Sequence, residues 1–185
     1  MKHALIIVDY QNDFIHPQGI IAKKIGNAKL ENHQKLSAKI QKLIDKWHTE
    51  RQPVIFLCAD YNTDNYLGDF KKFRQKNLYG NAAKRGSWGH KLFKIKRNIK
   101  DKIIIKNYFD GFYKTALNSF LKKQNINKLY LCGANVDVCI FFTAISARNR
   151  GFKVNIINSA SAGTAPGLKQ IFLHQLDKIS GIKII

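Results

Sequence analysis

Acidic residues are scarce in this chain. Asp and Glu number 12 against 32 Lys and Arg, which gives a formal net charge of +20. The excess is densest between Lys71 and Lys106, where Asp101 is the one acidic residue. A basic surface attracts phosphates without sequence specificity, but lysine is abundant throughout the chain, and no zinc finger, RRM or helix-turn-helix pattern is present. We therefore interpret the charge as a solvated basic face and do not expect nucleic acid as a partner.

Long apolar runs are also lacking. No run approaches the roughly 20 residues that a membrane-spanning helix needs, and the first one, Ala4–Val8, is too short for a signal peptide and is closed by Asp9. These features predict a cytoplasmic protein without membrane contact. Apolar residues make up 45% of the 185 positions, so the chain can form one domain, residues 1–185, with a sizeable core. Repeats and low-complexity segments that would divide it are absent.

Cysteine is rare, and the three residues are odd in number and are not spaced as a metal knuckle or a disulfide framework. Cys58 and Cys132 end strand-like runs, and we interpret them as inert core residues. Cys139 follows Gly133 and begins a segment of helical periodicity. Free N–H groups at a helix start are expected to lower the pKa of its thiol below the usual value of roughly 8.5. The alternative is a small buried residue at a helix start.

The apolar residues alternate between short continuous runs, typical of strands buried on both faces, and segments with helical spacing. This alternation predicts an α/β fold of three layers, with a six-stranded, mostly parallel sheet between helices. Between Ala59 and Ile99 the pattern weakens, so we expect a long connection that forms a lid or pocket wall or is partly helical. The expected strands are Ala4–Val8, Val54–Cys58, Asp101–Ile105, Lys128–Cys132, Val154–Ile157 and Ile182–Ile185, and the expected helices are Glu31–Glu50, Tyr113–Gln124, Val138–Arg150 and Gly167–Lys178.

Ionisable residues follow three of the predicted strands. Asp9 ends the first strand, Lys106 ends the third, and the fourth runs into the turn before Cys139. In a parallel sheet the carboxyl ends of the strands lie at one edge, where ligands bind. We therefore expect a carboxylate, an ammonium group and a thiol to meet at that edge.

Three segments at these strand ends carry a resemblance that extends over nearly the whole chain. They are Ile6–Phe14 (IIVDYQNDF), Lys106–Phe112 (KNYFDGF) and Gly133–Cys139 (GANVDVC). With them the chain resembles the isochorismatase-like cysteine hydrolases, which include nicotinamidases, N-carbamoylsarcosine amidases and ureidoacrylate amidases. The resemblance implies the isochorismatase-like hydrolase fold, a catalytic triad of Asp9, Lys106 and Cys139, and a homo-oligomer, either a dimer or a tetramer.

The resemblance also implies a role for each residue of the triad. Asp9 would act as general base, Lys106 would favour the thiolate and hold the carboxylate, and Cys139 would attack a carbonyl carbon to form a thioester. A cis peptide is implied between Ala134 and Asn135. The backbone N–H groups of Asn135 and Cys139 would then form an oxyanion hole.

The chain departs from its relatives at the metal site of the nicotinamidases, which place an Asp-x-His and a further His after the second strand. Here Asp60 is followed by Asn62, a poor zinc ligand, so we expect neither a metal nor another cofactor. Isochorismate hydrolases characteristically lack the cysteine. The expected activity is therefore hydrolysis of a C–N bond in a small-molecule amide, carbamoyl or ureido compound. The alternatives are a nicotinamidase, an isochorismate-type hydrolase, and a non-catalytic basic module for an anionic partner.

Four aromatic residues are candidates for the walls of a substrate pocket, because ligand sites are mostly apolar. They are Phe14, Trp88, Tyr108 and Phe112. Arg85 and His90 are candidates for selecting an anionic substrate. A papain-like Cys–His pair is not favoured, because the histidines lie in no recognisable motif, and His33 and His48 fall on a helix that we expect to be exposed.

Overall fold

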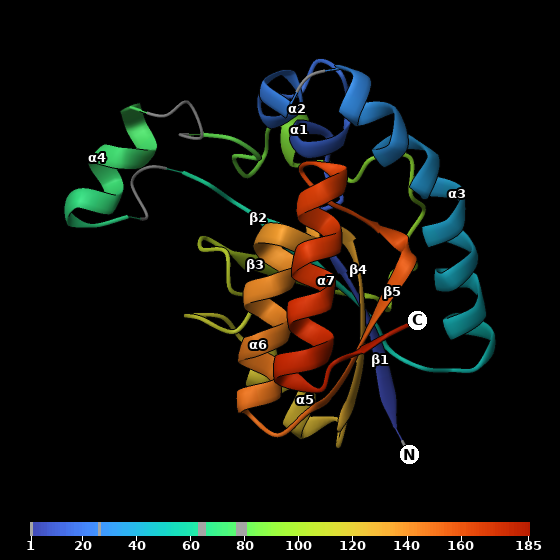
Figure 1. Ribbon diagram of the computed structural model, residues 1–185. Helices are drawn as coiled ribbons and strands as arrows, with labels where there is room; N and C mark the ends of the chain where they lie inside the picture. The colour runs from blue at the N-terminus through green and yellow to red at the C-terminus, as the bar shows by residue number, and fades with distance from the viewer. Residues whose placement is uncertain (1, 26, 63–65, 77–80) are drawn as a thin grey trace.

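The computed structural model describes residues 2–25, 27–62, 66–76 and 81–185. Its centre is a six-stranded sheet in the order β3-β2-β1-β4-β5-β6, in which all neighbouring strands are parallel (Figure 1). This confirms the prediction of a mostly parallel six-stranded sheet. The strands are β1 (His3–Val8), β2 (Val54–Ala59), β3 (Lys102–Lys106), β4 (Lys128–Ala134), β5 (Lys153–Ala162) and β6 (Lys183–Ile184).

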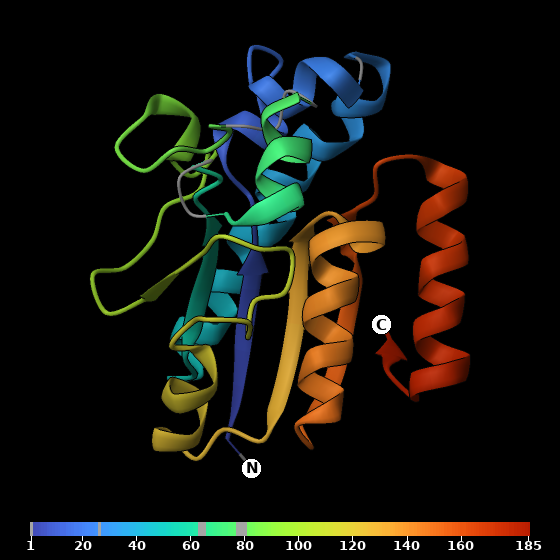
Figure 2. The ribbon, with the colours of Figure 1, turned by 90° about the vertical axis from the view of Figure 1, so that its left-hand side faces the viewer.

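Helices cover both faces of the sheet, which confirms the three layers. The chain fills the sheet from β1 to β3 in one direction and from β4 to β6 in the other, and right-handed crossovers then place the helices on opposite faces. Figures 1 and 2 show α3 on one face and α5, α6 and α7 on the other. The helices are α1 (Asn12–Ile15), α2 (Ile20–Ile25), α3 (Asn27–Thr49), α4 (Gly68–Lys76), α5 (Leu117–Lys123), α6 (Phe141–Asn149) and α7 (Pro166–Ser180), with a 3-10 turn, η2 (Trp88–His90), and a π-helical turn, η3 (Val136–Ile140).

The position of β1 at the centre of the sheet explains why its sequence is continuously apolar. Ile6 belongs to the core beneath α6, whereas Ile7 belongs to the core beneath α3, with Ile40 and Ile44 of that helix. Successive side chains of a strand point to opposite faces, so both faces of β1 must be apolar. The burial of Ile40 and Ile44, four residues apart, agrees with the helical spacing of the sequence.

Several element boundaries differ from the predictions, among them the start of helix α5 and the end of strand β5. Helix α5 begins at Leu117 rather than Tyr113, because Lys114 has a left-handed backbone (φ 51°) and the Thr115 hydroxyl accepts the N–H of Leu117. Strand β5 continues past its polar residues to Ala162, because it pairs again with β4 beyond a register shift. This long-range pairing is invisible in the local hydrophobic pattern.

The connection from Ala59 to Ile99 contains α4 and η2, so it is partly helical as expected. Its residues 63–65 and 77–80 lie outside the described residues. Figure 1 shows α4 projecting to one side of the sheet. The Gln11 side chain anchors the connection, because it accepts the N–H of Ala59 (2.8 Å) and donates to the carbonyls of Ala59 (3.1 Å) and His90 (2.9 Å). In the described part of the chain, no helix is both long and apolar enough to cross a membrane.

Candidate active site

The structure brings together the three ionisable residues that follow the predicted strands. The Nζ atom of Lys106 lies 2.7 Å from Oδ2 of Asp9 and 3.4 Å from Sγ of Cys139. All three residues are buried, with exposed fractions of 0% for Asp9, 1% for Lys106 and 4% for Cys139. A carboxylate, an ammonium group and a thiol therefore share one buried site.

The backbone at the ends of β1 and β3 aims the charged pair. Asp9 leaves β1 in a left-handed conformation (φ 48°), which Asp tolerates better than most residues, and its N–H donates to Leu57 (2.9 Å). Lys106 ends β3 beside Ala59 of β2, and its side chain reaches past β2 to Asp9. Nζ also donates to the carbonyl of Tyr108 (3.1 Å). The ammonium is thus held by a charge and by a fixed dipole.

Cys139 lies in the π-helical turn η3, so the predicted α-helix from Val138 is wrong in its first turn. The N–H of Ile140 donates to the carbonyl of Asn135 (3.0 Å), five residues earlier. Such π turns are frequent at functional sites. Before the turn, the peptide between Ala134 and Asn135 is cis, and a Cβ on Gly133 (φ 111°) would lie 2.3 Å from the carbonyl oxygen of Val8. Only glycine fits this contact between β4 and β1.

The thiol of Cys139 does not have the lowered pKa expected from the sequence. Burial and, after it, the charge of Asp9 raise its pKa to about 12, despite the opposing effects of Lys106 and Tyr61. The helix-start prediction was wrong because it took no account of burial beside a carboxylate. Burial alone would lower the pKa of Lys106, but Asp9 and Cys139 raise it above its usual value. The resting site therefore holds a neutral thiol and an ammonium group.

The raised pKa of Cys139 predicts a loss of stability at alkaline pH. Between about pH 9 and 12 the folded thiol keeps its proton, whereas the unfolded thiol loses it, so the free energy of unfolding falls as pH rises. The slope for one such group is about 1.4 kcal/mol per pH unit. Urea unfolding of the wild type and of Cys139→Ala should therefore show a difference in free energy that changes by this amount from pH 9.5 to 10.5. Parallel curves would contradict the assigned protonation state.

Tyr61 is a site residue that the sequence reasoning missed. Its hydroxyl lies 3.3 Å from Sγ of Cys139 and 3.4 Å from Nζ of Lys106. Burial holds the pKa of Tyr61 well above its usual value, so the phenol is neutral. The buried guanidinium of Arg74 covers the ring, 4.3 Å from its centroid. Tyr61 lies two residues beyond β2, and the rule for strand ends, applied to that strand too, would have identified it.

The four aromatic pocket candidates divide into two groups. Phe14 packs edge-on against Tyr61, with 5.9 Å between the ring centroids, and Tyr108 supplies the carbonyl that binds Lys106. The other two pack elsewhere. Trp88 is 45% exposed and lies against His16. Phe112 packs between the guanidinium of Arg150 and the ring of Phe152, beyond the end of α6 that is remote from Cys139, so the structure does not bring Phe112 to the triad.

The polar candidates also lie differently from the expectations. The N–H of Arg85 donates to Asp60 (3.1 Å), whereas Nδ1 of His90 lies 3.0 Å from the carbonyl of Ala59. Neither contact directs a side chain at the triad. His33 was expected to be exposed, but it is 2% exposed and its Nε2 lies 2.9 Å from Oδ1 of Asn135. That expectation was wrong because the chain segment before Cys139 covers this part of α3.

Comparison with known proteins identifies the family, because residues 3–183 match the isochorismatase domain. The chain belongs to the isochorismatase family. It is 26% identical over 166 residues to an isochorismatase family protein of Bacillus subtilis, covering 88% of this chain and 87% of the relative. It is 24% identical over 193 residues to the nicotinamidase of Saccharomyces cerevisiae, covering 83% and 84%. Members of this family are hydrolases that act on non-peptide C–N bonds, and this chain is an enzyme of that class.

Solved structures of other proteins share this fold. The pyrazinamidase of Pyrococcus horikoshii, solved in complex with zinc, superimposes with a TM-score of 0.85 at 24% identity, covering 100% of this chain and 99% of that one. The likeness shows the shared fold. It also raises the question of whether a zinc ion would fit here.

The donor groups at the corresponding stretch do not fit zinc. Oδ1 of Asp60 already accepts a backbone N–H, and position 62 is an asparagine, which is a poor zinc ligand. Within the described ranges, no group of three or more His, Cys, Asp or Glu residues is placed to hold a metal ion. Thr63, Asp64 and Asn65 lie outside those ranges. We derive no step of the reaction through a metal.

Proposed function

We propose that this protein is a cysteine-dependent hydrolase of a small amide, carbamoyl or ureido compound, which it cleaves through a thioester intermediate. The observation that carries the proposal is the position of the Lys106 ammonium, 2.7 Å from Asp9 and 3.4 Å from the sulfur of Cys139. A buried carboxylate beside a protonated thiol is the arrangement that general-base activation requires.

The reaction begins with proton transfer from the Cys139 thiol to Asp9 as the sulfur attacks the substrate carbonyl. The resulting oxyanion is stabilised by the backbone N–H groups of Asn135 and Cys139. Asp9 then returns the proton to the leaving nitrogen, and ammonia or an amine departs. Water, activated by Asp9, cleaves the thioester and releases the acid and the free thiol. Lys106 remains charged throughout and pairs with Asp9 between steps.

The substrate class follows from the cysteine and from the poor zinc donors. The yeast relative is a nicotinamidase, and another relative with 25% identity is the ureidoacrylate amidohydrolase of Acinetobacter baylyi, both of which cleave C–N bonds. The chain shares the cysteine position implied by the family resemblance but has an asparagine at position 62. These features favour a small amide, carbamoyl or ureido compound over nicotinamide.

The decisive experiment is a panel of carboxamides, N-carbamoyl compounds and ureido acids, with ammonia release and intact mass measured together. A true substrate should release ammonia and, after rapid acid quenching, leave an acyl mass on the peptide that contains Cys139. Peptides with Cys58 and Cys132 serve as internal controls and should remain unmodified. Ammonia release with an acyl mass on either control peptide would overturn the assignment of the nucleophile, and failure of the whole panel would overturn the substrate class.

Removal of metal should leave the activity unchanged. We expect dialysis against EDTA followed by metal-free buffer to change kcat/KM by less than about twofold, because the donors at Asp60 and Asn62 do not fit zinc. The measurement is turnover before and after dialysis, with a zinc-containing nicotinamidase treated in parallel as the control. Loss of activity that added zinc restores would show that residues outside the described ranges complete a metal site.

A further inference from the structure

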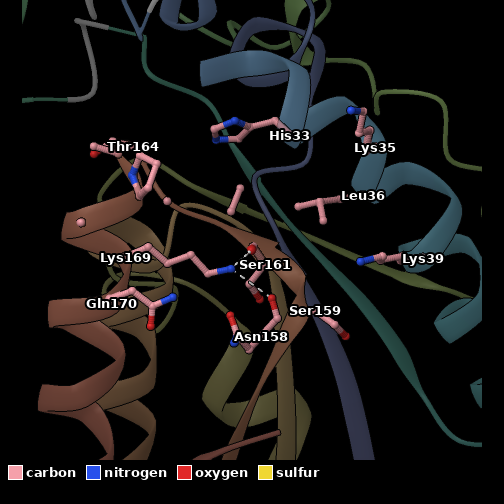
Figure 3. A pocket seen from close by; sticks show the side chains of 15 residues that line it. His33, Lys35, Leu36, Lys39, Asn158, Ser159, Ser161, Thr164, Lys169 and Gln170 are labelled. Carbon is pink, nitrogen blue, oxygen red and sulfur yellow. Dashed lines mark hydrogen bonds between the residues drawn. The ribbon is translucent and has the colours of Figure 1, made fainter. Parts of the chain in front are cut away.

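A cavity of about 970 Å³ opens at the carboxyl end of β5, apart from the triad. Its walls are the N-terminal half of α3, the end of β5 and the first turn of α7 (Figure 3). The cavity exists because β6 is short. In the described ranges β6 pairs only with Asn155 and Ile156, so the last residues of β5 keep one open edge between α3 and α7. None of the triad residues lines this space.

Lysines from opposite walls point into the cavity. Lys39 extends from α3 and Lys169 from α7, and their ammonium groups face each other across the end of β5 in Figure 3. Lys169 is held in place, because its Nζ donates to the carbonyls of Asn158 (3.1 Å) and Ser161 (2.7 Å). Burial lowers the pKa of Lys169, and the charge of Lys39 lowers it further. The two ammonium groups therefore repel each other.

No acidic side chain among the described lining residues balances the two ammonium charges. Among the described residues that line the cavity there is no Asp or Glu. Lys169 binds only neutral carbonyls in these contacts, which orient its charge without cancelling it. The first turn of α7, from Pro166, adds the positive end of a 15-residue helix. The lining is thus complementary to an anion with more than one charge.

We propose that this cavity is a binding site for the phosphate group of a small molecule. A phosphate monoester carries a charge of about −1.5 to −2 at pH 7 and can bind both lysines, whereas one carboxylate balances only one of them. The volume falls within the range of small-molecule sites, about 300–1,000 Å³, so the remainder of a phosphorylated compound fits beside the phosphate. The proposal does not depend on the reaction at Cys139.

Three hydrogen bonds connect the cavity to the segment that carries Cys139, one of them from the Thr164 hydroxyl to Asp137. His33, in the α3 wall, lies 2.9 Å from Oδ1 of Asn135, and the N–H of Thr164, in the loop before α7, donates to Asp137 (2.9 Å). Asn135 and Asp137 flank the start of η3. Ligand binding between α3 and α7 therefore acts on the backbone that positions the sulfur, and it should slow amide hydrogen exchange in residues 134–140.

The experiment uses the full chain and inorganic phosphate at constant ionic strength, with chloride as the balancing salt and acetate as the carboxylate arm. Calorimetric titration should show saturable phosphate binding that acetate does not reproduce. Lys169→Gln and Lys39→Gln should each weaken binding by about tenfold. Lys39 is exposed on α3, so its substitution leaves the fold intact even if loss of the Lys169 contacts disturbs the loop.

The matched control is Lys46→Gln, which removes the same charge from α3 two turns beyond Lys39 and outside the cavity. It should bind phosphate as the wild type does. Equal binding by the Lys39 and Lys46 variants, or linear uptake without saturation, would overturn the site, and tighter binding of acetate would overturn the assignment to phosphate. Unchanged exchange in residues 134–140 at phosphate saturation would overturn the connection to the cysteine segment.

Discussion

The Cys139→Ala variant should fold normally and lose at least about ten-thousand-fold in kcat against a true substrate. The loss is this large because no covalent intermediate can form without the sulfur, while Asp9 and Lys106 remain in place at 2.7 Å. The measurement is ammonia release under saturating substrate, with circular dichroism and urea unfolding to show that the variant is folded.

Cys58→Ala provides a matched control for this experiment. Cys58 is also buried, at 3% exposure, and burial together with the charge of Asp9 raises its pKa to about 12, as for Cys139. Both variants thus lose a buried thiol near the same carboxylate. Of these two cysteines, Cys139 is the one whose sulfur lies 3.4 Å from Nζ of Lys106. We expect Cys58→Ala to retain kcat within about threefold. Turnover by Cys139→Ala at the level of Cys58→Ala would end the proposal of a cysteine nucleophile.

The buried pair of Asp9 and Lys106 should produce the largest effect on stability. Asp9→Asn leaves the ammonium of Lys106 without its counter-charge, and Lys106→Met leaves the carboxylate of Asp9 without one. Both side chains have an exposed fraction of 0%, and breaking such a pair costs about 3–5 kcal/mol. The double variant removes both charges and should be more stable than the sum of the single losses predicts, while all three variants lack activity. Urea unfolding of the four proteins gives the coupling energy directly.

A surface pair in the same protein calibrates that measurement. Lys46, on α3, and Glu50, just beyond the end of that helix, are exposed, and their charged groups lie 3.8 Å apart. The coupling energy of such surface pairs is about 0.2–1 kcal/mol. The same double-mutant cycle applied to this pair should give a small coupling energy that salt reduces further. Equal coupling for the two pairs, or additive losses at Asp9 and Lys106, would mean that the buried charges do not interact as the structure indicates.

The sequence by itself determined the sheet and the place of the site. Continuous apolar runs require strands buried on both faces, and alternation with amphipathic helices requires a parallel sheet, so the residues after the strands had to lie at one edge. Asp9, Lys106 and Cys139 could be selected in this way without coordinates. The strand rule was applied too narrowly, however, since Tyr61 follows β2 at the same edge and contacts the sulfur.

Only the tertiary structure decided the chemical state of the site and its neighbours. The pKa of Cys139 rises because distant segments bury the thiol beside Asp9, whereas the sequence displays only the helix start, which argued for a lower value. Phe112 and His33 also lie in surroundings other than those expected, for the same reason. Phe112 packs against Phe152 beyond α6, and His33 binds Asn135. Local patterns specify which face of an element is apolar, but burial and hydrogen-bond partners are set by residues far away in the chain, and these contacts exist only in the folded protein.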